Sequence, residues 1–200
     1  MLEGQSGEVE KWAAEASARI GIPVVLLPQA DWNNDLTPWP AGPIFRKGKS
    51  FGGGAESYLQ QLENQILPEI ESRLGLVDPE RWLIGISLSG LFALWAAVDS
   101  DLFTRIASIS GSFWYEGFLE WLATRPGTGA LKSAYLSLGN TEADTRNPHL
   151  KSIADDTEAV VRLLREKGIS TVFEWNDGPH FAPVVPRLEK ALAGLFGRAR

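Results

Sequence analysis

The stretch that decides the fold is residues 81–95, which read R-W-L-I-G-I-S-L-S-G-L-F-A-L-W. Trp82–Ile84 is a short apolar run of the kind that forms a buried strand. From Leu91 onward the apolar residues recur at helical spacing as far as Val98. Ser87 lies between the two segments. The stretch therefore predicts a strand, a tight turn with a serine at its apex, and a helix.

This order of elements is the layout of a nucleophile elbow. In such a turn the serine hydroxyl is held clear of the sheet, and the first N–H groups of the helix point to the same place, where they suit an oxyanion. The turn needs small residues two positions before and after the serine. Gly85 meets the first need, whereas position 89 is a serine followed by Gly90. We predict Ser87 as a nucleophile; the alternative is an ordinary strand-to-helix turn capped by a serine.

The composition is that of a globular protein. The 200 residues are 44% hydrophobic and 22% charged, with a net charge of −6 and no cysteine. This length fits one domain over residues 1–200. The acidic balance argues against a nucleic-acid or anionic-membrane partner, and no apolar run is long enough to span a bilayer. The polar first ten residues do not resemble a signal peptide, so the expected location is cytoplasmic.

Strand-like and helix-like segments alternate along the chain. Short apolar runs predict strands at Ile22–Leu27, Trp82–Ile84, Arg105–Ser110, Ala134–Leu138 and Thr171–Trp175. Amphipathic spacing and capping signals predict helices at Val9–Arg19, Glu56–Leu74 with a bend at Pro68, Asn147–Lys167, and from Val184 onward. A long loop is expected at Pro28–Ser50. This alternation predicts an α/β fold with a mostly parallel, doubly wound sheet covered on both faces.

Three polar residues follow the ends of predicted strands, which is where chemistry collects in a parallel α/β sheet. They are, in chain order, Ser87, Glu142 and His180. A serine hydroxyl needs a base at neutral pH, and histidine is suited to that role while an acid orients its ring. His180 follows the last strand directly, whereas the other histidine, His149, lies at a predicted helix start. His180 is therefore the candidate base; the alternative is a loop histidine packed against Phe181.

The candidate acid has alternatives. Glu142 lies three residues after Gly139, which ends a predicted strand, and Asp144 comes two residues later. Asp177 is a third carboxylate, but its place before Gly178 favours an Asx turn. We favour Glu142 and keep Asp144 as the second choice; the alternative for both is a solvated acidic loop.

Further motifs accompany these residues: D-L-T-P at 35–38, L-P-E-I at 67–70 and S-G-S-F-W at 110–114. Together with the elbow, Gly139-x-x-Glu142 and Gly178-x-His180, they resemble the "Putative esterase" branch of the α/β-hydrolase superfamily, which includes enterobactin-type siderophore esterases, esterase D-like enzymes and feruloyl esterases. The resemblance implies an α/β-hydrolase fold and a serine esterase that cleaves a small-molecule carboxylic ester through an acyl-enzyme without a cofactor. It implies Ser87 as nucleophile, His180 as base, Glu142 as acid, and the Leu88 N–H as one oxyanion donor.

The front of the chain departs from this resemblance. Members of the branch normally have further strands before the helix predicted at Val9–Arg19, so the fold is expected to be shortened at the N-terminus. Leu2-Glu3-Gly4 resembles the tail of the strand that carries the second oxyanion donor, which places that donor near Gly4 or Gln5. A missing central strand leaves unpaired sheet edges that either a second copy of the chain or a further N-terminal segment would cover, so a homo-oligomer is one of two expectations. A catalytically degenerate binding protein of the same fold is the alternative to an enzyme.

Loop tryptophans are the candidate substrate-binding residues. Trp32, Trp39 and Trp114 lie in stretches that follow predicted strands, where an aromatic wall would favour an apolar or planar acyl group or the face of a sugar. The alternative is that they close the core. No cluster of His, Asp and Glu has metal-ligand spacing, and Gly48-Lys49-Ser50 lacks the earlier glycine of a phosphate-binding loop, so we expect no metal and no nucleotide cofactor.

Overall fold

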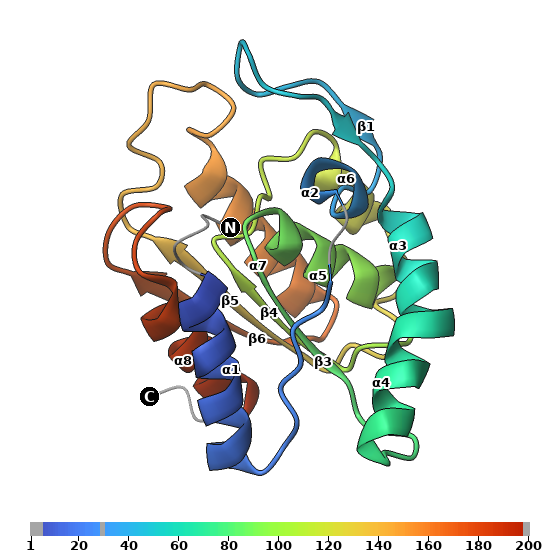
Figure 1. The fold of residues 1–200 in the computed structure, drawn as a ribbon. Helices are drawn as coiled ribbons and strands as arrows, with labels where there is room; N and C mark the ends of the chain where they lie inside the picture. Colours follow the sequence, from blue (N-terminus) through green and yellow to red (C-terminus); the bar gives the residue numbers. More distant parts are fainter. Residues whose placement is uncertain (1–5, 29–30, 198–200) are drawn as a thin grey trace.

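The centre of the molecule is a sheet of four parallel strands that neighbour one another in chain order (Figure 1). The computed structural model describes residues 6–28 and 31–197. The strands are β3 (Trp82–Ile86), β4 (Arg105–Ile109), β5 (Ser133–Gly139) and β6 (Ser170–Asn176). Trp82 pairs with Arg105 at one end, and Gly139 pairs with Asn176 at the other. Because the strands are parallel, their carboxyl ends share one edge of the sheet, and the predicted functional residues follow these ends.

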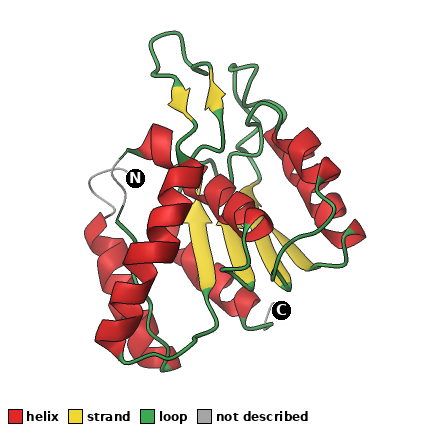
Figure 2. Ribbon diagram, turned by 90° about the vertical axis from the view of Figure 1, so that its right-hand side faces the viewer, coloured by secondary structure: helices red, strands yellow, loops and turns green. Residues whose placement is uncertain are grey.

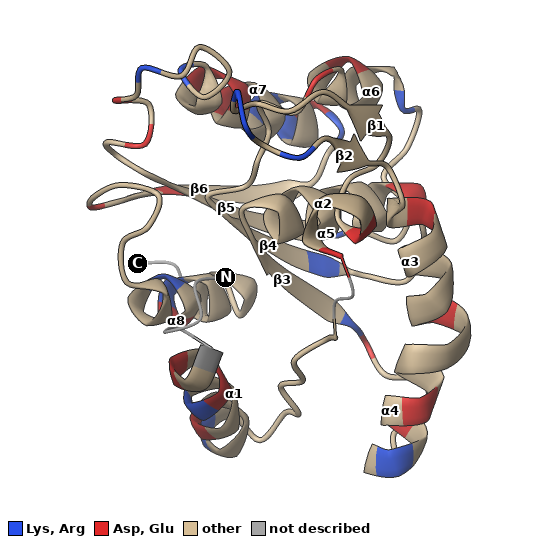
Figure 3. Ribbon diagram, turned by 45° about the horizontal axis from the view of Figure 1, so that its top comes forward, with Lys and Arg blue, Asp and Glu red and all other residues tan. Residues whose placement is uncertain are grey.

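Helices cover both faces of this sheet. Figure 3 shows α5 (Leu88–Asp99), α6 (Phe118–Thr124) and α7 (Ile153–Glu166) on one side, and α1 (Ser6–Ile20) and α8 (Val184–Leu195) on the other. Each face has its own apolar core. Ten of the twelve residues of α5 are buried, because the sheet covers one side of this helix and α3 (Ala55–Gln61) packs against another. The predicted parallel α/β sheet is thus confirmed.

Charged residues of both signs are scattered over the outer helices (Figure 3). Within residues 6–28 and 31–197, none of the helices combines the length and the apolar content needed to cross a bilayer.

The segment predicted as one helix at Glu56–Leu74 is helical throughout but changes its winding. It consists of α3, a π-helical turn η2 (Leu62–Ile66), and α4 (Leu67–Leu74). Pro68 explains the wide turn, because proline has no N–H to donate and its ring clashes with the carbonyl four residues earlier. The bend expected at this proline therefore takes the form of a widened turn just before it.

The prediction of a buried strand at Ile22–Leu27 is wrong. This segment has no regular structure, and Ile22, Val25 and Leu26 are 44%, 43% and 46% exposed. A strand needs a neighbour with which to pair, and among the described residues the sheet ends at β3. The apolar residues of the segment line a cavity beside β3 instead. Their sequence is that of a strand, but no strand lies next to them in the part of the chain that the structure describes.

The expected loop Pro28–Ser50 contains some regular structure. A helical turn, α2 (Trp32–Asp35), is capped by the carboxylate of Asp31, which accepts the N–H groups of residues 33 and 34. Beyond it, β1 (Pro40–Ala41) pairs with the antiparallel β2 (Phe51–Gly52). Figure 2 shows this short pair at the same end of the molecule as the arrowheads of the main sheet.

The helix predicted from Asn147 begins later, at Ile153. The side-chain oxygen of Asn147 accepts the N–H of His149 at 3.0 Å, and residues 148–152 form turns. An asparagine that binds its own backbone two residues on favours a turn over a helix, which accounts for the late start.

Candidate active site

Ser87 lies at the junction of β3 and α5 in a strained backbone conformation. Its φ is +59° and its ψ is −124°, in a region that residues with a side chain rarely adopt. The Ser87 N–H donates to the carbonyl of Ile109 at 3.0 Å, and the Ser87 carbonyl accepts from Leu91 at 3.0 Å and from Ser112 at 3.1 Å. These bonds from β4 and α5 hold the strained turn in place. Strain of this kind costs about 1–3 kcal/mol and is concentrated at functional sites.

The residues on either side of the serine explain how the turn fits. A Cβ added to Gly85 would lie 1.9 Å from the Ser89 carbonyl oxygen, so only glycine is possible there. On the helix side, a Cβ on Gly90 would lie 2.7 Å from Ser108 Oγ and 3.1 Å from the Gly111 Cα. Gly90 therefore makes the close approach to β4, and position 89 can hold a side chain.

Ser89 also has a role of its own. Its hydroxyl donates to the carbonyl of Ile86 at 2.7 Å and accepts the Ile86 N–H at 2.7 Å. Ile86 ends β3, which pairs with β4 on one side and, among the residues that the structure describes, with no strand on the other. The hydroxyl of Ser89 thus binds backbone polar groups of Ile86 that a glycine at position 89 would leave to water. A serine in place of the usual glycine at this position is therefore compatible with the turn.

Replacing Gly85 by alanine is expected to destabilise the protein by about 3 kcal/mol or more, because the new methyl group meets backbone rather than a movable side chain. Urea unfolding monitored by circular dichroism measures the change. Gly127→Ala is the matched control, since a Cβ at that glycine meets no atom within 4 Å. Equal stability of the Gly85→Ala variant and the wild type would show that the turn differs from this description.

His180 lies in the loop between β6 and α8 and contacts both other candidate residues. Its Nε2 is 3.1 Å from Ser87 Oγ, and its Nδ1 is 2.7 Å from Glu142 Oε2. With the Nδ1 proton donated to the carboxylate, Nε2 is left free to accept the serine proton. The ring also packs edge-on against Phe181, at 5.1 Å between centroids and 89° between planes. The packing expected of a loop histidine and the contact with Ser87 therefore occur together.

Glu142 lies in the turn that follows β5, and its two carboxylate oxygens have different partners. Oε2 faces His180, while Oε1 accepts from Ser110 Oγ at 2.6 Å and from the Gly139 N–H at 2.7 Å. The Glu142 side chain is only 3% exposed. The two alternative acids lie elsewhere: Asp144 is exposed, and Asp177 Oδ1 accepts from Asn140 at 3.2 Å. Among the three carboxylates considered, the structure brings Glu142 to the imidazole.

The environment of Glu142 keeps its carboxyl ionised. Burial on its own raises the pKa of this carboxyl, but hydrogen bonds from His180 and Ser110, the charge of the imidazole and the N–H of Gly139 together outweigh that effect. The pKa of Glu142 therefore lies below its ordinary value of 4.5. A carboxylate held ionised in this way can orient an imidazole and stabilise its cation.

This shift predicts how stability depends on pH. Because the folded pKa of Glu142 is lowered, its contribution is fully present above pH 4.5 and is lost as the pH falls through the folded pKa. The contribution of the ionised carboxylate is measured as the difference in the free energy of unfolding between the wild type and Glu142→Gln. This difference should decrease progressively as the pH falls below 4.5. Urea unfolding of both proteins from pH 7 downward measures the difference. A difference that stays constant through the acid range would contradict the lowered pKa.

One of the two predicted oxyanion donors falls within the described residues. The Leu88 N–H belongs to the first residue of α5, where a helix leaves its backbone donors without intrahelical acceptors. The second predicted donor, at Gly4 or Gln5, lies outside the described residues. Ser112, which the sequence analysis did not single out, is buried, and its Oγ is 3.5 Å from Ser87 Oγ.

A cavity of about 1130 Å³ opens onto these residues. Ser87, Glu142 and His180 line it together with Trp32 and Trp114, and it continues along β3 past the apolar segment 22–27. Two of the three candidate tryptophans therefore line the same cavity as Ser87. Its largely apolar walls suit an apolar or aromatic group.

The predicted substrate-binding role of Trp39 is not supported by its position, because this side chain is not among the residues that line the cavity. Its indole N–H donates to the carbonyl of Glu116 at 2.8 Å, and its ring packs against Tyr115 and Trp121. Trp39 joins the β1 loop to the segment before α6, which is the core-closing alternative considered for the loop tryptophans.

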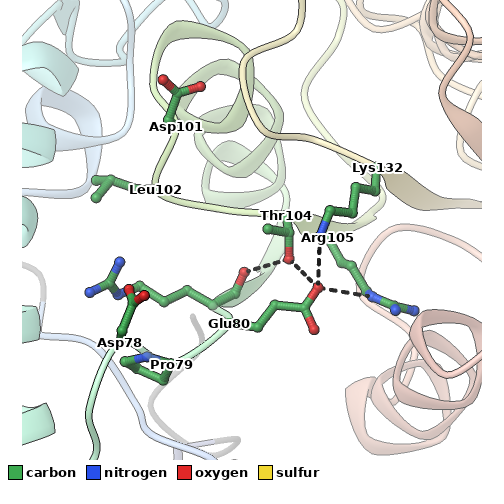
Figure 4. Close-up of a pocket in the computed structure, with 9 residues that line it drawn as sticks. Asp78, Pro79, Glu80, Asp101, Leu102, Thr104, Arg105 and Lys132 are labelled. Carbon is green, nitrogen blue, oxygen red and sulfur yellow. Dashed lines mark hydrogen bonds and ion pairs between the residues drawn. The ribbon is translucent and has the colours of Figure 1, made fainter.

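A second, smaller hollow lies at the opposite end of the sheet, near the starts of β3 and β4 (Figure 4). Its charged groups neutralise one another: Glu80 accepts from Thr104 at 2.7 Å and lies 3.7 Å from Arg105 and 3.8 Å from Lys132. Such mutually paired surface groups leave little to bind a ligand. Among residues 6–28 and 31–197 there is also no group of three or more His, Asp or Glu side chains placed to hold a metal ion.

Sequence reasoning missed two residues at the back of the site, Ser110 and Arg187. Ser110 is the first residue of the S-G-S-F-W motif, which was the usable signal. The predicted strand ran through Ser110, whereas β4 ends at Ile109 and leaves Ser110 just past the strand. Arg187 lies in the first turns of α8 and is only 5% exposed. Nothing in its neighbourhood in sequence distinguishes it from an exposed helical arginine.

Comparison with known proteins agrees with this architecture. A family model described as "Putative esterase" matches residues 4–156. The uncharacterized protein YbbA of Bacillus subtilis (strain 168) is 33% identical over 143 residues, which are 68% of this chain and 56% of that protein. Apo-salmochelin esterase of Escherichia coli O6:H1 is 30% identical over 125 residues, or 60% and 39% of the two chains. An IroE-like serine hydrolase from Shewanella oneidensis has a TM-score of 0.69 at 22% identity and covers 84% of this chain and 58% of its own.

The parallel sheet, the serine turn and the structural match define an α/β-hydrolase fold, as predicted. Within that class, the chain belongs to the "Putative esterase" family. It spans about half the length of the curated relatives that it matches, 56% of one and 39% of the other.

Proposed function

We propose that the protein is a serine esterase that hydrolyses a carboxylic ester of a small molecule. The observation that carries the proposal is the 3.1 Å approach of His180 Nε2 to Ser87 Oγ, on a serine held in a strained strand-to-helix turn. Family membership and the name of the E. coli relative, apo-salmochelin esterase, support the same reaction. Neither a metal nor an organic cofactor is part of the proposal.

The proposed chemistry proceeds in two half-reactions. His180 Nε2 takes the hydroxyl proton as Ser87 Oγ bonds to the ester carbonyl carbon, and the displaced electron pair collects on the carbonyl oxygen beside the Leu88 N–H. Collapse of this intermediate breaks the ester C–O bond, and the departing alkoxide takes the proton from His180. Water then repeats the sequence: it gives a proton to His180, attacks the acyl carbon and releases the acid, so that Ser87 is restored. Glu142 holds the ring in one orientation throughout.

The cavity indicates the kind of acyl group. Trp32 and Trp114 line it together with Ser87, and the ring of Trp114 packs against Phe51 at 6.0 Å between centroids. A rigid aromatic wall of this type favours an apolar or planar group over a charged one. We therefore propose an aromatic or apolar acyl ester as the substrate class.

A fluorophosphonate probe tests the proposal directly, because it forms a stable bond only with an activated serine. We expect one probe per chain, and peptide mass mapping should locate it on Ser87. A panel of aromatic, long-chain and short-chain esters then identifies the preferred acyl group. A folded protein that takes up no probe and cleaves none of the esters would overturn the proposal in favour of a binding protein with a hydrolase fold.

A further inference from the structure

The guanidinium of Arg187 lies behind the candidate triad and contacts the acid. Its Nη1 donates to Ser110 Oγ at 3.0 Å and to Glu142 Oε1 at 3.3 Å. The Arg187 side chain is 6% exposed, so this ion pair is removed from water. A buried arginine would be costly without partners, and here the carboxylate and the serine hydroxyl supply them.

The other nitrogen of the same guanidinium reaches the loop that carries His180. Nη2 donates to the carbonyl of Pro179 at 3.0 Å and to the carbonyl of Asp177 at 3.3 Å. These two carbonyls flank Gly178, whose φ of +89° turns the loop toward the sheet. The backbone immediately before His180 is therefore tied to the same planar group that binds the acid.

We propose that Arg187 is a positioning residue: its guanidinium fixes the His180 loop and the Glu142 carboxylate relative to each other, so that the imidazole reaches Ser87. This inference rests on the proposed function, since it explains how the site holds the geometry that hydrolysis needs. His180 and Glu142 come from separate loops, after β6 and after β5. Only the Nδ1 to Oε2 contact joins their side chains directly. The Asn140 side chain joins the two loops through Asp177 Oδ1 and the Gly178 N–H. The guanidinium differs from it in binding the acid itself, through Glu142 Oε1, together with the loop carbonyls.

The backbone is packed closely around this group. A Cβ on Gly139 would lie 2.2 Å from the Gly178 carbonyl oxygen, 2.8 Å from Glu142 Oε1 and 3.0 Å from Arg187 Nη2. Ser110, whose hydroxyl joins Arg187 to Glu142, has a positive φ of +50° that aims its side chain from the end of β4 into the cluster. The guanidinium and the carboxylate can therefore approach each other because position 139 has no side chain. The Ser110 hydroxyl joins them because its backbone directs the side chain between them.

The alternative is that Arg187 only neutralises the buried charge of Glu142. The two roles make different demands on the side chain. Charge neutralisation needs one cation, which lysine supplies, whereas bridging needs a planar fork with donors pointing in two directions, which lysine lacks. Arg187→Lys therefore separates the two roles.

The experiment compares the wild type with Arg187→Lys and with the control Arg165→Lys. Arg165 also donates through two guanidinium nitrogens, Nε and Nη2, to the Thr171 carbonyl, and it is not among the residues that line the cavity. For Arg187→Lys we expect kcat on the best ester of the panel to fall about 100-fold, because the base is displaced, while KM changes less than about threefold. Arg165→Lys should keep the kcat of the wild type. Unfolding temperatures of both variants are measured alongside.

Two further measurements keep the test decisive. Arg187→Ala assayed with methylguanidinium should recover part of the lost kcat, and methylammonium should not restore it. In the unmodified protein, nuclear magnetic resonance should show slowly exchanging Nη protons for Arg187 and a downfield Nδ1 proton for His180. The resonance measurement uses the unmodified protein, so it requires neither catalytic activity nor a variant that folds.

Wild-type kcat in Arg187→Lys, or freely exchanging Nη protons in the unmodified protein, would overturn the positioning role. Absence of probe labelling and of ester cleavage in the wild type would instead overturn the proposed function, and the resonance measurement would still decide whether Arg187 bridges the loop and the acid. Loss of kcat in Arg187→Lys with rescue of Arg187→Ala by methylguanidinium supports the proposal.

Discussion

Ser87→Ala is expected to lower kcat for ester hydrolysis by about 10⁶-fold and to abolish labelling by a fluorophosphonate. The loss is this large because the proposed acyl-enzyme forms on Ser87 Oγ. Ser112 Oγ lies 3.5 Å from Ser87 Oγ, but the imidazole Nε2 of His180 faces Ser87, at 3.1 Å. Steady-state kinetics on the preferred ester, with protein mass spectrometry after probe treatment, measures both effects.

Ser100→Ala is the matched control for this variant. Ser100 lies at the other end of α5, where its hydroxyl donates to the Ala96 carbonyl at 2.7 Å, far along the helix from the site. Its removal should leave kcat unchanged. If Ser87→Ala keeps more than a trace of the wild-type kcat, the acyl-enzyme mechanism is wrong for this protein.

Glu142→Gln is expected to lower kcat by about 10⁴-fold, with a smaller effect on KM. The amide keeps the size of the side chain but no longer offers a charged acceptor to His180 Nδ1, which is 2.7 Å away. The imidazole can then adopt the tautomer that presents a proton, rather than a lone pair, to Ser87. The pH dependence of kcat in both proteins measures the change in the base.

Asp144→Asn is the comparison that separates the two candidate acids of the sequence analysis. Asp144 is exposed and lies two residues beyond Glu142 in the same turn. Its replacement should have little effect on kcat. A large loss in Asp144→Asn together with a small loss in Glu142→Gln would move the role of the acid to Asp144.

The sheet and the candidate triad were predictable because their signals are local. A strand, a glycine and a serine followed by an apolar helix define the turn at Ser87 within about ten residues. Glu142 and His180 stand directly after apolar strands, and parallel strands bring their carboxyl ends together whatever the intervening chain does. Only one of the two histidines had that placement, so the base could be chosen without knowledge of the contacts.

The errors came from properties that the local pattern does not contain. Ile22–Leu27 has the composition of a strand, but pairing depends on a neighbour, and none lies beside it among the described residues. The contacts of Trp39 were equally out of reach: it has the same setting in sequence as Trp114, but its indole N–H binds the Glu116 carbonyl and its ring packs against Trp121. Arg187 could not be found at all, because its burial results from two loops that fold over it.

The order in which the site is built along the chain has a practical consequence. Ser87 and Glu142 precede Gly168, whereas His180 and Arg187 follow it, and Gly168 lies in an open turn between α7 and β6 where a Cβ meets no atom within 4 Å. Dividing the polypeptide there yields two fragments, neither of which holds both a nucleophile and a base. Fused to a pair of interacting proteins, such fragments would regain turnover only on reassembly, which is the property required of a complementation reporter.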